Sequence, residues 1–558
     1  MGHRRRPGGF ELIRYAFQAS YSPSKFSTFL IIFLANAVPF VYSESVEGKY
    51  LTIPINADTA SVLSRLQSFL TSHQIETYIV GGLVRDLVLQ RSTMDIDISI
   101  AIDALSTGPE IAEYLGAHSV VLDSENGVVR LLPVNLGKSS ARPWQIDIAT
   151  MQGDLIDDLG RRDFTIDAMA MDLAKIKVDA PSSTSTYVLD PFDGIGDARR
   201  KLVRAVNPRV FKDDAIRLLR GVRLSVELGF EIDPETESFI ERDHHLIKDI
   251  AGERIREEIL KLLEPGDSYN AIVYLDKLGL LTSIIPELAA TRDVDQSQEH
   301  TWNVFHHSAH SISALDFILR RGEWEFSGPE VLNGIPWNEG ISSYFDSEIS
   351  PHSSRRVLTK LAALLHDIAK PQTRIINEFG KVRFYGHPQE GAPIATAILE
   401  RLHFSKREIK FVENIVRYHL RPVQMTEDNA PPTKRAIYRY YRDMGEAAYA
   451  NLFFSLADHL ATRGPELEKD NWDWHIGVVA KVITEHETMP QTTRPTKLLD
   501  GNDLINELRL KPGPRMGELL EALREAQAAG EVSTRTEALD FVNKLSANLG
   551  GTPQTGSG

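Results

Sequence analysis

Hydrophobic and polar positions change their pattern within one short stretch of the chain, which predicts a strand, a helix and a second strand. The apolar run at residues 78–80 predicts the first strand, and residues 83–90 have the apolar spacing of a helix. The second strand is predicted over residues 95–100. Because the side chains of a strand alternate between its two faces, Asp95 and Asp97 should lie on the same face.

This stretch carries residue types that suit a phosphate and a metal. Gly81 and Gly82 let the backbone turn tightly and let a phosphate approach, and the helix that follows offers free N–H groups. Two neighbouring carboxylates suit Mg²⁺, which also takes oxygens from nucleotide phosphates. Taken alone, the glycines are explained by an ordinary turn, and the two aspartates by a solvated strand. Both halves in order, with Arg85 between them, favour nucleotide chemistry.

The surrounding residues predict an α/β domain. Helices are predicted over residues 58–72 and 108–115, and further strands over residues 119–123, 128–133 and 144–150. The last of these strands carries Asp147. Its carboxylate would complete a metal site as a third ligand, although an isolated aspartate on a sheet face explains it nearly as well.

A second motif, at residues 159–172, combines cations with apolar residues. Arg161 and Arg162 offer forked donors to phosphates, and Asp163 can orient them or bind a ribose hydroxyl. The apolar residues of the segment hold it in a core. Two arginines on a solvated face are the alternative when the motif is taken alone.

Residues 207–223 predict a helix with a polar face. Asp214 and Arg217 share that face, and Arg220 and Arg223 lie one and two turns further along. A carboxylate accepts from the exocyclic amine of cytosine or adenine, and arginine donates to ring nitrogens and oxygens. The pattern therefore suits the reading of a base, and a helix with ordinary ion pairs is the alternative.

In this order the motifs resemble the nucleotidyltransferase superfamily and, within it, the bacterial tRNA nucleotidyltransferase (CCA-adding) and poly(A) polymerase family. The resemblance runs from Tyr78 to Leu288, with Asp167 in place of an asparagine and Asp213 in place of a glutamate. It implies catalytic carboxylates at Asp95, Asp97 and Asp147, with Mg²⁺ held by Asp95 and Asp97. It implies nucleotide binding by Gly81, Gly82, Arg85, Arg162, Asp163, Asp214, Arg217, Arg220 and Arg223.

A second constellation of metal-binding residue types lies in the C-terminal half. It comprises His307, His366, Asp367, His387, His419 and Asp458. A single buried histidine is usually a core residue, but an adjacent His-Asp pair with distant partners suits a divalent transition metal. The set resembles the HD phosphohydrolase domain, a helical fold, which implies metal ligands at His307, His366, Asp367 and Asp458. A structural HD domain without activity is the alternative.

Cations and aromatic rings alternate at residues 433–442. Arg435, Arg439 and Arg442 are interleaved there with tyrosines such as Tyr438. This mixture suits contact with an RNA backbone and stacking on bases. An ordinary amphipathic helix explains it equally well.

Composition limits these interpretations in three ways. The absence of cysteine excludes disulfides and thiolate metal sites, and it fits a reducing, cytoplasmic location. The net charge of −15 argues against general coating of nucleic acid, so RNA must be bound by local basic patches. The apolar run near residues 29–42 is short for a membrane span, so we expect no membrane association, and a membrane anchor is the alternative.

We therefore predict an α/β nucleotidyltransferase head followed by helical domains. The predicted segments are an N-terminal extension (1–50, disordered or dispensable), the head (51–200), a helical neck and body for nucleotide selection and RNA binding (201–295), an HD domain (296–490), a helical tail (491–549) and a disordered end (550–558).

The predicted reaction is metal-dependent addition of C, A or both, from CTP and ATP, to the 3′ end of tRNA. The head would use Mg²⁺, and the HD domain would use a transition metal for a second, phosphohydrolase activity. Three alternatives remain: a poly(A) polymerase, an HD phosphohydrolase whose head senses nucleotides, and an RNA-binding protein without catalysis.

One feature that CCA-adding members carry is missing. In those members a long flexible loop with basic and aromatic residues joins the third carboxylate strand to the arginine motif, and members that add only two cytosines lack it. Here residues 148–160 fill that position, with three aspartates and no lysine, arginine or aromatic residue. The resemblance therefore implies strong CTP use and weak addition of the terminal A.

Overall fold

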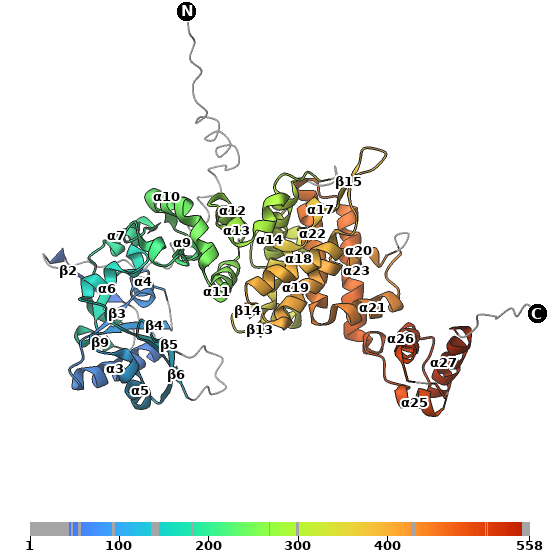
Figure 1. The fold of residues 1–558 in the computed structure, drawn as a ribbon, viewed down its shortest axis with the longest axis horizontal. Helices are drawn as coiled ribbons and strands as arrows, with labels where there is room; N and C mark the ends of the chain where they lie inside the picture. Colours follow the sequence, from blue (N-terminus) through green and yellow to red (C-terminus); the bar gives the residue numbers. More distant parts are fainter. Residues whose placement is uncertain are drawn as a thin grey trace, which may run out of the picture. The chain divides into compact units, whose positions relative to one another are not determined.

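The computed structural model describes residues 44–549, with gaps at residues 46–47, 54–56, 92–94, 135–143, 181–182, 267, 297–300, 427–429, 508 and 511. The chain divides into two compact units (Figure 1). The first contains the described residues up to Leu155 together with Met169–Pro191, and the second contains Ile156–Ala168 and the chain from Phe192 onward. The apolar run near residues 29–42 and the end of the chain from residue 550 lie outside the described residues.

A mixed sheet forms the centre of the first unit and confirms the predicted α/β class (Figure 1). The strands follow the order β1-β2-β10-β8-β3-β4-β7-β6-β5, and β9 pairs with β10. β4 and β7 are parallel, and the other described pairs of this sheet are antiparallel. The strands are β1 (Glu44–Ser45), β2 (Gly48–Ile53), β3 (Thr77–Val80), β4 (Asp95–Ile100), β5 (Ala117–Asp123), β6 (Val128–Pro133), β7 (Gln145–Thr150), β8 (Ala170–Asp172), β9 (Lys177–Ala180) and β10 (Ser183–Leu189).

The sheet begins earlier than the sequence predicts. The last residues of the predicted extension, from residue 44 to residue 50, form β1 and the start of β2. β2 pairs antiparallel with β10, with Tyr50 opposite Tyr187 and Thr52 opposite Ser185. Aromatic and β-branched residues favour such pairing, so the head starts before residue 51.

Four helical segments accompany the sheet in the first unit: α3 (Ala57–Ser72), α4 (Gly82–Val88), α5 (Ala104–Leu115) and the 3₁₀ turn η2 (Leu173–Lys175). α5 begins four residues before the predicted helix, because the carboxylate of Asp103 accepts hydrogen bonds from the N–H groups of Leu105 and Ser106. α5 packs against α3, β5 and β6. Ile96 and Ile98 of β4 are buried, as their alternation with the aspartates predicts.

The second unit is mainly helical. Its N-terminal part contains α6 (Leu155–Gly160), η1 (Thr165–Asp167), α7 (Gly194–Arg200), β11 (Leu202–Val203), α8 (Val210–Asp213), α9 (Arg217–Leu228), β12 (Glu231–Ile232), α10 (Pro234–Asp243), η3 (His244–Asp249), α11 (Gly252–Leu263), α12 (Ser268–Lys277), α13 (Leu280–Ile284) and η4 (Pro286–Thr291). β11 and β12 form a short parallel pair.

A helical bundle follows in the second unit. It contains α14 (Val304–Ile318), η5 (Pro329–Leu332), α15 (Glu339–Asp346), β13 (Glu348–Ser350), β14 (Ser353–Ser354), α16 (Arg355–Leu365), α17 (Lys370–Thr373), β15 (Arg374–Ile376), β16 (Val382–Phe384), α18 (His387–Arg401), α19 (Lys406–Tyr418), α20 (Arg421–Gln424), α21 (Lys434–Met444), η6 (Gly445–Ala447), α22 (Ala448–Arg463), η7 (Gly464–Glu466), α23 (Lys469–Thr488) and α24 (Pro490–Thr493). α14 packs against α16 and α22, and α19 packs against α16 and α18. These contacts bring the ends of distant helices together.

The chain ends in a small helical tail. It consists of α25 (Gly501–Asn506), α26 (Pro514–Ala529) and α27 (Arg535–Leu549). The tail has an apolar cluster of its own, in which Leu504, Leu519 and Val542 are fully buried. Among the residues that the structure describes, no helix is both long enough and apolar enough to cross a membrane.

A buried ion pair connects two helices of the bundle. Lys360 of α16 and Asp316 of α14 are almost fully buried, and Lys360 Nζ lies 2.5 Å from the Asp316 carboxylate. The ammonium group also donates to the carbonyl oxygens of Leu263, the last residue of α11, and of Pro265, two residues further on. A buried pair of this kind is sensitive to loss of one partner, because the remaining charge is left without compensation.

Replacing Asp316 by alanine should therefore lower the free energy of unfolding by about 3–5 kcal/mol. Urea denaturation followed by far-ultraviolet circular dichroism measures this loss. The matched control is Asp473→Ala, which breaks an exposed pair with Lys469 and should leave the midpoint nearly unchanged. Equal effects of both substitutions would contradict a stabilising role for the buried pair.

Candidate active site

The aspartates of the head gather on one face of the sheet. β4 and β7 run parallel, and Asp97 is in register with Asp147. Register partners of a parallel pair point to the same face, and Asp95 shares this face because it lies two residues from Asp97. Asp95 is exposed, whereas Asp97 and Asp147 are half-buried. The structure thus brings all three predicted carboxylates to one strip of the sheet.

Arg130 lies on β6, the strand next to β7 on the side away from β4, and it binds Asp147. Its Nε and Nη2 atoms donate to the two oxygens of Asp147 over 2.8 and 2.7 Å. The hydrogen bond to Asp147 is the largest influence that raises the pKa of Arg130, and the charges of Asp95 and Asp97 add to it. Sequence reasoning missed Arg130, because only the register of β6 against β7 places it opposite Asp147.

The glycine turn lies directly beside this strip. Gly81 has a φ angle of 70°, which glycine adopts without strain, and α4 begins at Gly82. A Cβ atom added to Gly82 would lie 3.9 Å from the nearer Asp97 oxygen and 3.6 Å from Nη2 of Arg85. Arg85 is buried and donates to the carboxylate of its neighbour Asp86 over 2.9 Å. A side chain at Gly82 would therefore be in van der Waals contact with both a cation and a carboxylate.

The arginine motif belongs to the second unit, where Asp163 is buried. Arg220 of α9 binds Asp163 over 2.8 Å, and its other end lies 3.8 Å from Asp167. Burial would raise the pKa of Asp163, but Arg220, followed by Arg217, holds that pKa below its ordinary value. Arg220, which the sequence predicts to bind the nucleotide, therefore forms an ion pair with Asp163 of the arginine motif.

Asp214 and Arg217 do not share a helix face, so that prediction is wrong. α8 ends at Asp213, Asp214 has extended backbone angles (φ −154°, ψ 105°), and α9 starts at Arg217. Arg254 holds the Asp214 carboxylate with two hydrogen bonds of 3.1 and 2.7 Å. Helical periodicity cannot predict this break.

The other predicted base-reading arginines contact protein groups. Arg217 donates to the carbonyl oxygens of Arg161 and Val210 over 2.9 and 3.3 Å. Arg223 pairs with Glu258 and Glu227 over 2.6 and 2.7 Å. In contrast, the buried Nε atom of Arg162 finds no hydrogen-bond acceptor among the residues that the structure describes.

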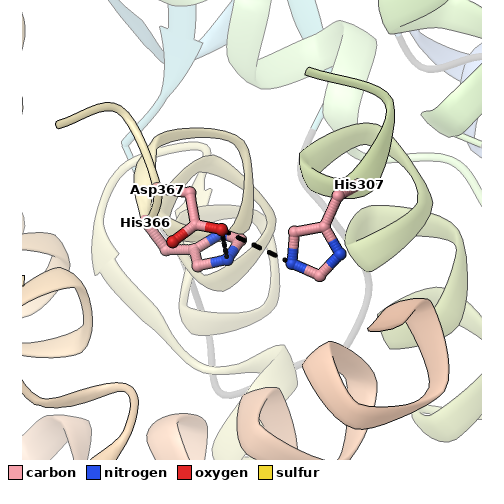
Figure 2. A group of neighbouring side chains, drawn as sticks. All are labelled: His307, His366 and Asp367. Carbon is pink, nitrogen blue, oxygen red and sulfur yellow. Dashed lines mark ion pairs between the residues drawn. The ribbon is translucent and has the colours of Figure 1, made fainter. Parts of the chain in front are cut away.

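The second constellation forms a buried cluster in the helical bundle. His307 lies on α14, His366 and Asp367 follow α16, and Asp458 lies on α22. His307 Nε2 is 3.6 Å from Asp367, and His366 Nε2 is 3.1 Å from Asp367 (Figure 2). His307 Nε2 also lies 2.9 Å from Asp458. All four predicted HD residues thus meet at one point.

Two further histidines extend the cluster on the opposite side of Asp367. His387 Nε2 lies 3.2 Å from the second Asp367 oxygen, and His419 Nε2 lies 3.9 Å from it. Lys370, one helical turn after Asp367, also binds this carboxylate over 2.6 Å. The predicted ligand set omitted His387 and His419, although their His-containing segments were visible in the sequence.

The imidazoles are oriented by hydrogen bonds within their own segments. The Nδ1 atoms of His366, His387 and His419 each lie 2.8 Å from the carbonyl oxygen three residues earlier. This geometry fixes Nδ1 as the protonated nitrogen and leaves each Nε2 as a ligand atom. Burial lowers the pKa of His419 to about 3, so its imidazole is neutral, as metal binding requires.

The donor atoms fit divalent metal ions. Within the described part of the chain, two groups each bring their ligand atoms within 4.8 Å of one another: His307, His366 and Asp367 form one, and Asp367, His387 and His419 form the other. Asp367 belongs to both groups. Burial would raise the pKa of Asp367, but the neighbouring His366 and Lys370 hold it well below its ordinary value, so the carboxylate stays charged.

Sequence families match successive parts of the chain. Residues 77–204 match the poly A polymerase head domain, and residues 229–291 match the probable RNA and SrmB-binding site of polymerase A. Residues 338–463 match the HD domain, and residues 478–542 match the putative tRNA nucleotidyltransferase domain 2. His307 lies outside the matched HD residues, although the structure places it in the cluster.

Curated relatives match most of the chain. The A-adding tRNA nucleotidyltransferase of Deinococcus radiodurans is 29% identical over 84% of this chain and 94% of its own length. The CC-adding tRNA nucleotidyltransferase of Thermus thermophilus is 30% identical over 84% of this chain and 93% of its own length.

The solved structures agree on the fold. An apo form of a CCA-adding enzyme has a TM-score of 0.56 and 17% identity, covering 89% of this chain and 96% of that chain. Identity of 30% over 84% of this chain and 93% of the Thermus relative is the stronger finding, because it covers nearly the whole of that relative. The chain belongs to the tRNA nucleotidyltransferase family.

Proposed function

We propose that this enzyme adds cytidines from CTP to the 3′ end of tRNA. The observation that carries the proposal is the strip formed by Asp95, Asp97 and Asp147 beside the Gly81–Gly82 turn. Hard carboxylate oxygens next to an open turn suit Mg²⁺ and a nucleotide triphosphate. The named activities of the Thermus and Deinococcus relatives support tRNA as the acceptor. The reaction would take place in the cytoplasm, where tRNA and nucleoside triphosphates occur.

In the proposed reaction the 3′-hydroxyl oxygen of the RNA attacks the α-phosphate of CTP and pyrophosphate leaves. Asp95 and Asp97 would hold Mg²⁺, which lowers the pKa of the hydroxyl and neutralises the triphosphate. Arg130 limits the charge of the strip by pairing with Asp147. Asp147 would therefore bind Mg²⁺ together with Asp95 and Asp97 only if it gives up part of its pairing with Arg130.

Phosphate and sugar would be positioned by the glycine turn and by the arginine motif. Gly82 lacks a side chain where the triphosphate would approach Asp97, and Arg85 lies beside it. The unused Nε donor of Arg162 suits a phosphate oxygen. Arg220 holds Asp163 and keeps its pKa below the ordinary value, and we assign this carboxylate to a ribose hydroxyl.

Base selection is assigned to Asp214 and Arg217. Arg254 fixes the Asp214 carboxylate but leaves it partly exposed, so it can accept from the exocyclic amine of cytosine or adenine. Arg217 would supply the second contact after exchanging a carbonyl partner for the base. Arg220 and Arg223 support this region through ion pairs in our proposal and need not touch the base.

The short connection after β7 supports cytidine addition without the terminal A. β7 ends at Thr150 and α6 occupies Leu155–Gly160 immediately before the arginine motif. This leaves no room for a long flexible loop with basic residues. The Thermus relative, named CC-adding, agrees with this proposal.

A second candidate is addition of the terminal A alone. The Deinococcus relative, named A-adding, covers the chain to the same extent and at nearly the same identity. Both candidate activities would use the same head. They differ in the 3′-terminal sequence of the tRNA that is extended and in the nucleoside triphosphate that is used.

Asp97→Asn should reduce nucleotide addition by a factor of about 10³ or more, because a charged metal ligand is lost at the transition state. Single-turnover incorporation of labelled CTP into tRNA that ends at the discriminator base measures the rate. Asp86→Asn, which alters a neighbouring carboxylate outside the strip, is the matched control. Addition at the wild-type rate by folded Asp97→Asn would refute the metal-ligand role.

Primer extension on tRNA ending at the discriminator base, with CTP and ATP together, should stop after two cytidines. A parallel reaction on tRNA ending in CC, with ATP, tests the second candidate. Complete three-nucleotide extension would show that a long loop is not needed. Extension only of the CC-ending tRNA would establish A addition, and long A tracts on unrelated RNA would establish a poly(A) polymerase.

We further propose that the HD cluster holds two divalent transition-metal ions with Asp367 shared between them. His307, His366 and Asp458 would complete one site, and His387 and His419 the other. Bound metal of this kind activates water for attack on a phosphoester. Lys370 keeps Asp367 charged and oriented for both sites. A cavity of about 480 Å³ borders the cluster and contains Arg383 and Arg463, cations that suit a phosphate group.

The double variant His387→Ala, His419→Ala should bind half as much metal as the wild type after loading with Mn²⁺, Ni²⁺ or Co²⁺. His366→Ala should disrupt the cluster and end hydrolysis of bis(p-nitrophenyl) phosphate. Elemental analysis by inductively coupled plasma mass spectrometry gives the metal content. CTP addition should be unchanged in each variant, because the head does not use these residues. Wild-type protein that neither retains metal nor hydrolyses the ester would assign the domain a structural role.

A further inference from the structure

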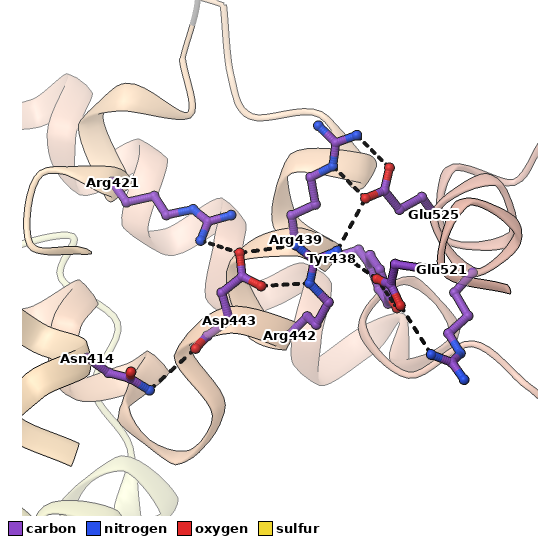
Figure 3. Close-up of polar contacts among 9 residues, drawn as sticks. Asn414, Arg421, Tyr438, Arg439, Arg442, Asp443, Glu521 and Glu525 are labelled. Carbon is purple, nitrogen blue, oxygen red and sulfur yellow. Dashed lines mark hydrogen bonds and ion pairs between the residues drawn. The ribbon is translucent and has the colours of Figure 1, made fainter. Parts of the chain in front are cut away.

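The arginines of α21 form a stripe that faces the tail. Arg435, Arg439 and Arg442 are spaced at i, i+4 and i+7, so they follow one side of the helix. Each of them binds a glutamate of the tail, and Figure 3 shows the contacts of Arg439 and Arg442. The residues that the sequence singles out as an RNA-binding candidate are therefore covered by acidic side chains.

The contacts have the geometry of a two-pronged arginine–carboxylate pair. Arg439 donates from Nε and Nη2 to the two oxygens of Glu525 over 2.7 and 2.5 Å. Arg442 donates to Glu521 over 2.6 Å, and the hydroxyl of Tyr438 donates to the same carboxylate over 3.1 Å. Arginine binds phosphates with the same fork, so a nucleic-acid backbone could replace these carboxylates one for one.

The acidic face of the tail forms a matching row. Glu521 and Glu525 are one turn apart on α26, or about 6 Å along the helix axis. Glu531, just beyond the end of α26, continues the row and binds Arg435 over 2.9 and 2.8 Å. A row of three carboxylates presents anionic oxygens to the arginines, as a phosphate backbone would.

The interface is built so that it can open. The arginine side chains remain 36–48% exposed, and water and salt weaken ion pairs in such positions. The apolar cluster of the tail consists of tail residues such as Leu519, Leu523 and Val542. The tail can therefore leave α21 without losing its own core.

A cavity of about 580 Å³ begins at the same arginine stripe. Arg439 lines it together with Arg417, Arg421, Tyr418 and Tyr385. The ring of Tyr385 is 69% exposed, and Arg421 stacks on Tyr418 with its guanidinium carbon 5.3 Å from the ring centre. An exposed ring (Tyr385) and a half-buried ring (Tyr418) among arginines form the kind of surface on which single-stranded nucleic acids stack their bases and bind their phosphates.

This cavity shares part of its lining with the one that borders the HD cluster. Both are lined by Phe384, Tyr385, His387, Leu420 and Gln424. Arg417 and Arg421 are paired with Glu413 and Asp443 of the bundle, whereas Arg439 is paired with Glu525 of the tail. Release of the tail would thus uncover a cation of this cavity, next to the one that the histidines line.

We propose that the α21 stripe and the adjoining cavity bind single-stranded RNA, and that α26 of the tail covers this site by imitating the RNA backbone. Binding of RNA there and docking of the tail then exclude each other. The site is separate from the head, so the proposal does not depend on which nucleotide the head adds.

The first test measures affinity for a fluorescein-labelled single-stranded 12-mer of RNA by fluorescence anisotropy. Removing the cover with Glu521→Gln, Glu525→Gln and Glu531→Gln should tighten binding by about tenfold at low salt. The control triple Asp470→Asn, Glu518→Gln and Asp540→Asn changes the net charge equally but leaves the stripe covered, and its affinity should stay near that of the wild type. Equal tightening by both triples would reduce the effect to net charge and overturn the proposal.

Replacing Arg435, Arg439 and Arg442 by glutamine in the uncovered variant should remove the gain. The slope of log affinity against log salt should become shallower by about 2, because three phosphate contacts are lost. RNA containing 4-thiouridine should cross-link to residues 385–442 in the uncovered variant more than in the wild type. An unchanged salt slope together with cross-links confined to the head would overturn the assignment of the site.

A covalent lock tests the exclusion directly, because the chain has no cysteine of its own. Arg435→Cys with Glu531→Cys can be joined by a short bis-maleimide, and the same protein capped with N-ethylmaleimide is the matched control. The joined form should bind the 12-mer more weakly than the capped form. Both forms should add CTP to tRNA normally, which shows that the variants are folded. Equal affinity of the two forms would show that the tail does not cover the site.

Discussion

Parallel pairing of β4 with β7 is the constraint on which the head depends. It aligns Asp97 with Asp147, and the strand alternation brings Asp95 to the same face. A shift of either strand by one residue would turn these carboxylates into the core and the isoleucines toward solvent. The buried isoleucines on the opposite face therefore fix the register that the proposed metal site requires. Arg130 reduces the repulsion among the three negative charges while no metal is bound.

The HD cluster also gathers side chains from separate elements, but it combines imidazoles with carboxylates. Its ligand atoms come from the ends of helices that are far apart in the sequence, and the packing of α14, α16, α19 and α22 brings them together. Backbone carbonyls orient the imidazoles, and Asp367 links the two groups. Carboxylates alone suit the hard Mg²⁺ ion, whereas imidazoles with carboxylates suit transition metals, so the two proposed centres differ in the metal that they favour.

The sequence predicts local features of this protein well and tertiary contacts less well. Alternation identified β4 and β7, and helical spacing identified most of α3 and α5, because a repeating pattern determines each of them. Asp214 lies in the break between α8 and α9, and its ion-pair partner Arg254 is forty residues away, so neither feature follows from helical spacing. Arg130 was missed for the same reason, since its role follows only from the register of β6. The segment with the α21 arginines forms a helix, and its contact with RNA stays a prediction; nothing local indicates that tail glutamates lie against these arginines.

The proposed metal site of the head is tested most directly by diffraction from a complex with Mn²⁺ and a non-hydrolysable CTP analogue. Anomalous peaks are expected within ligand distance of Asp95 and Asp97, with the triphosphate beside Gly82. Peaks at other carboxylates, or a bound nucleotide without metal at this strip, would contradict it.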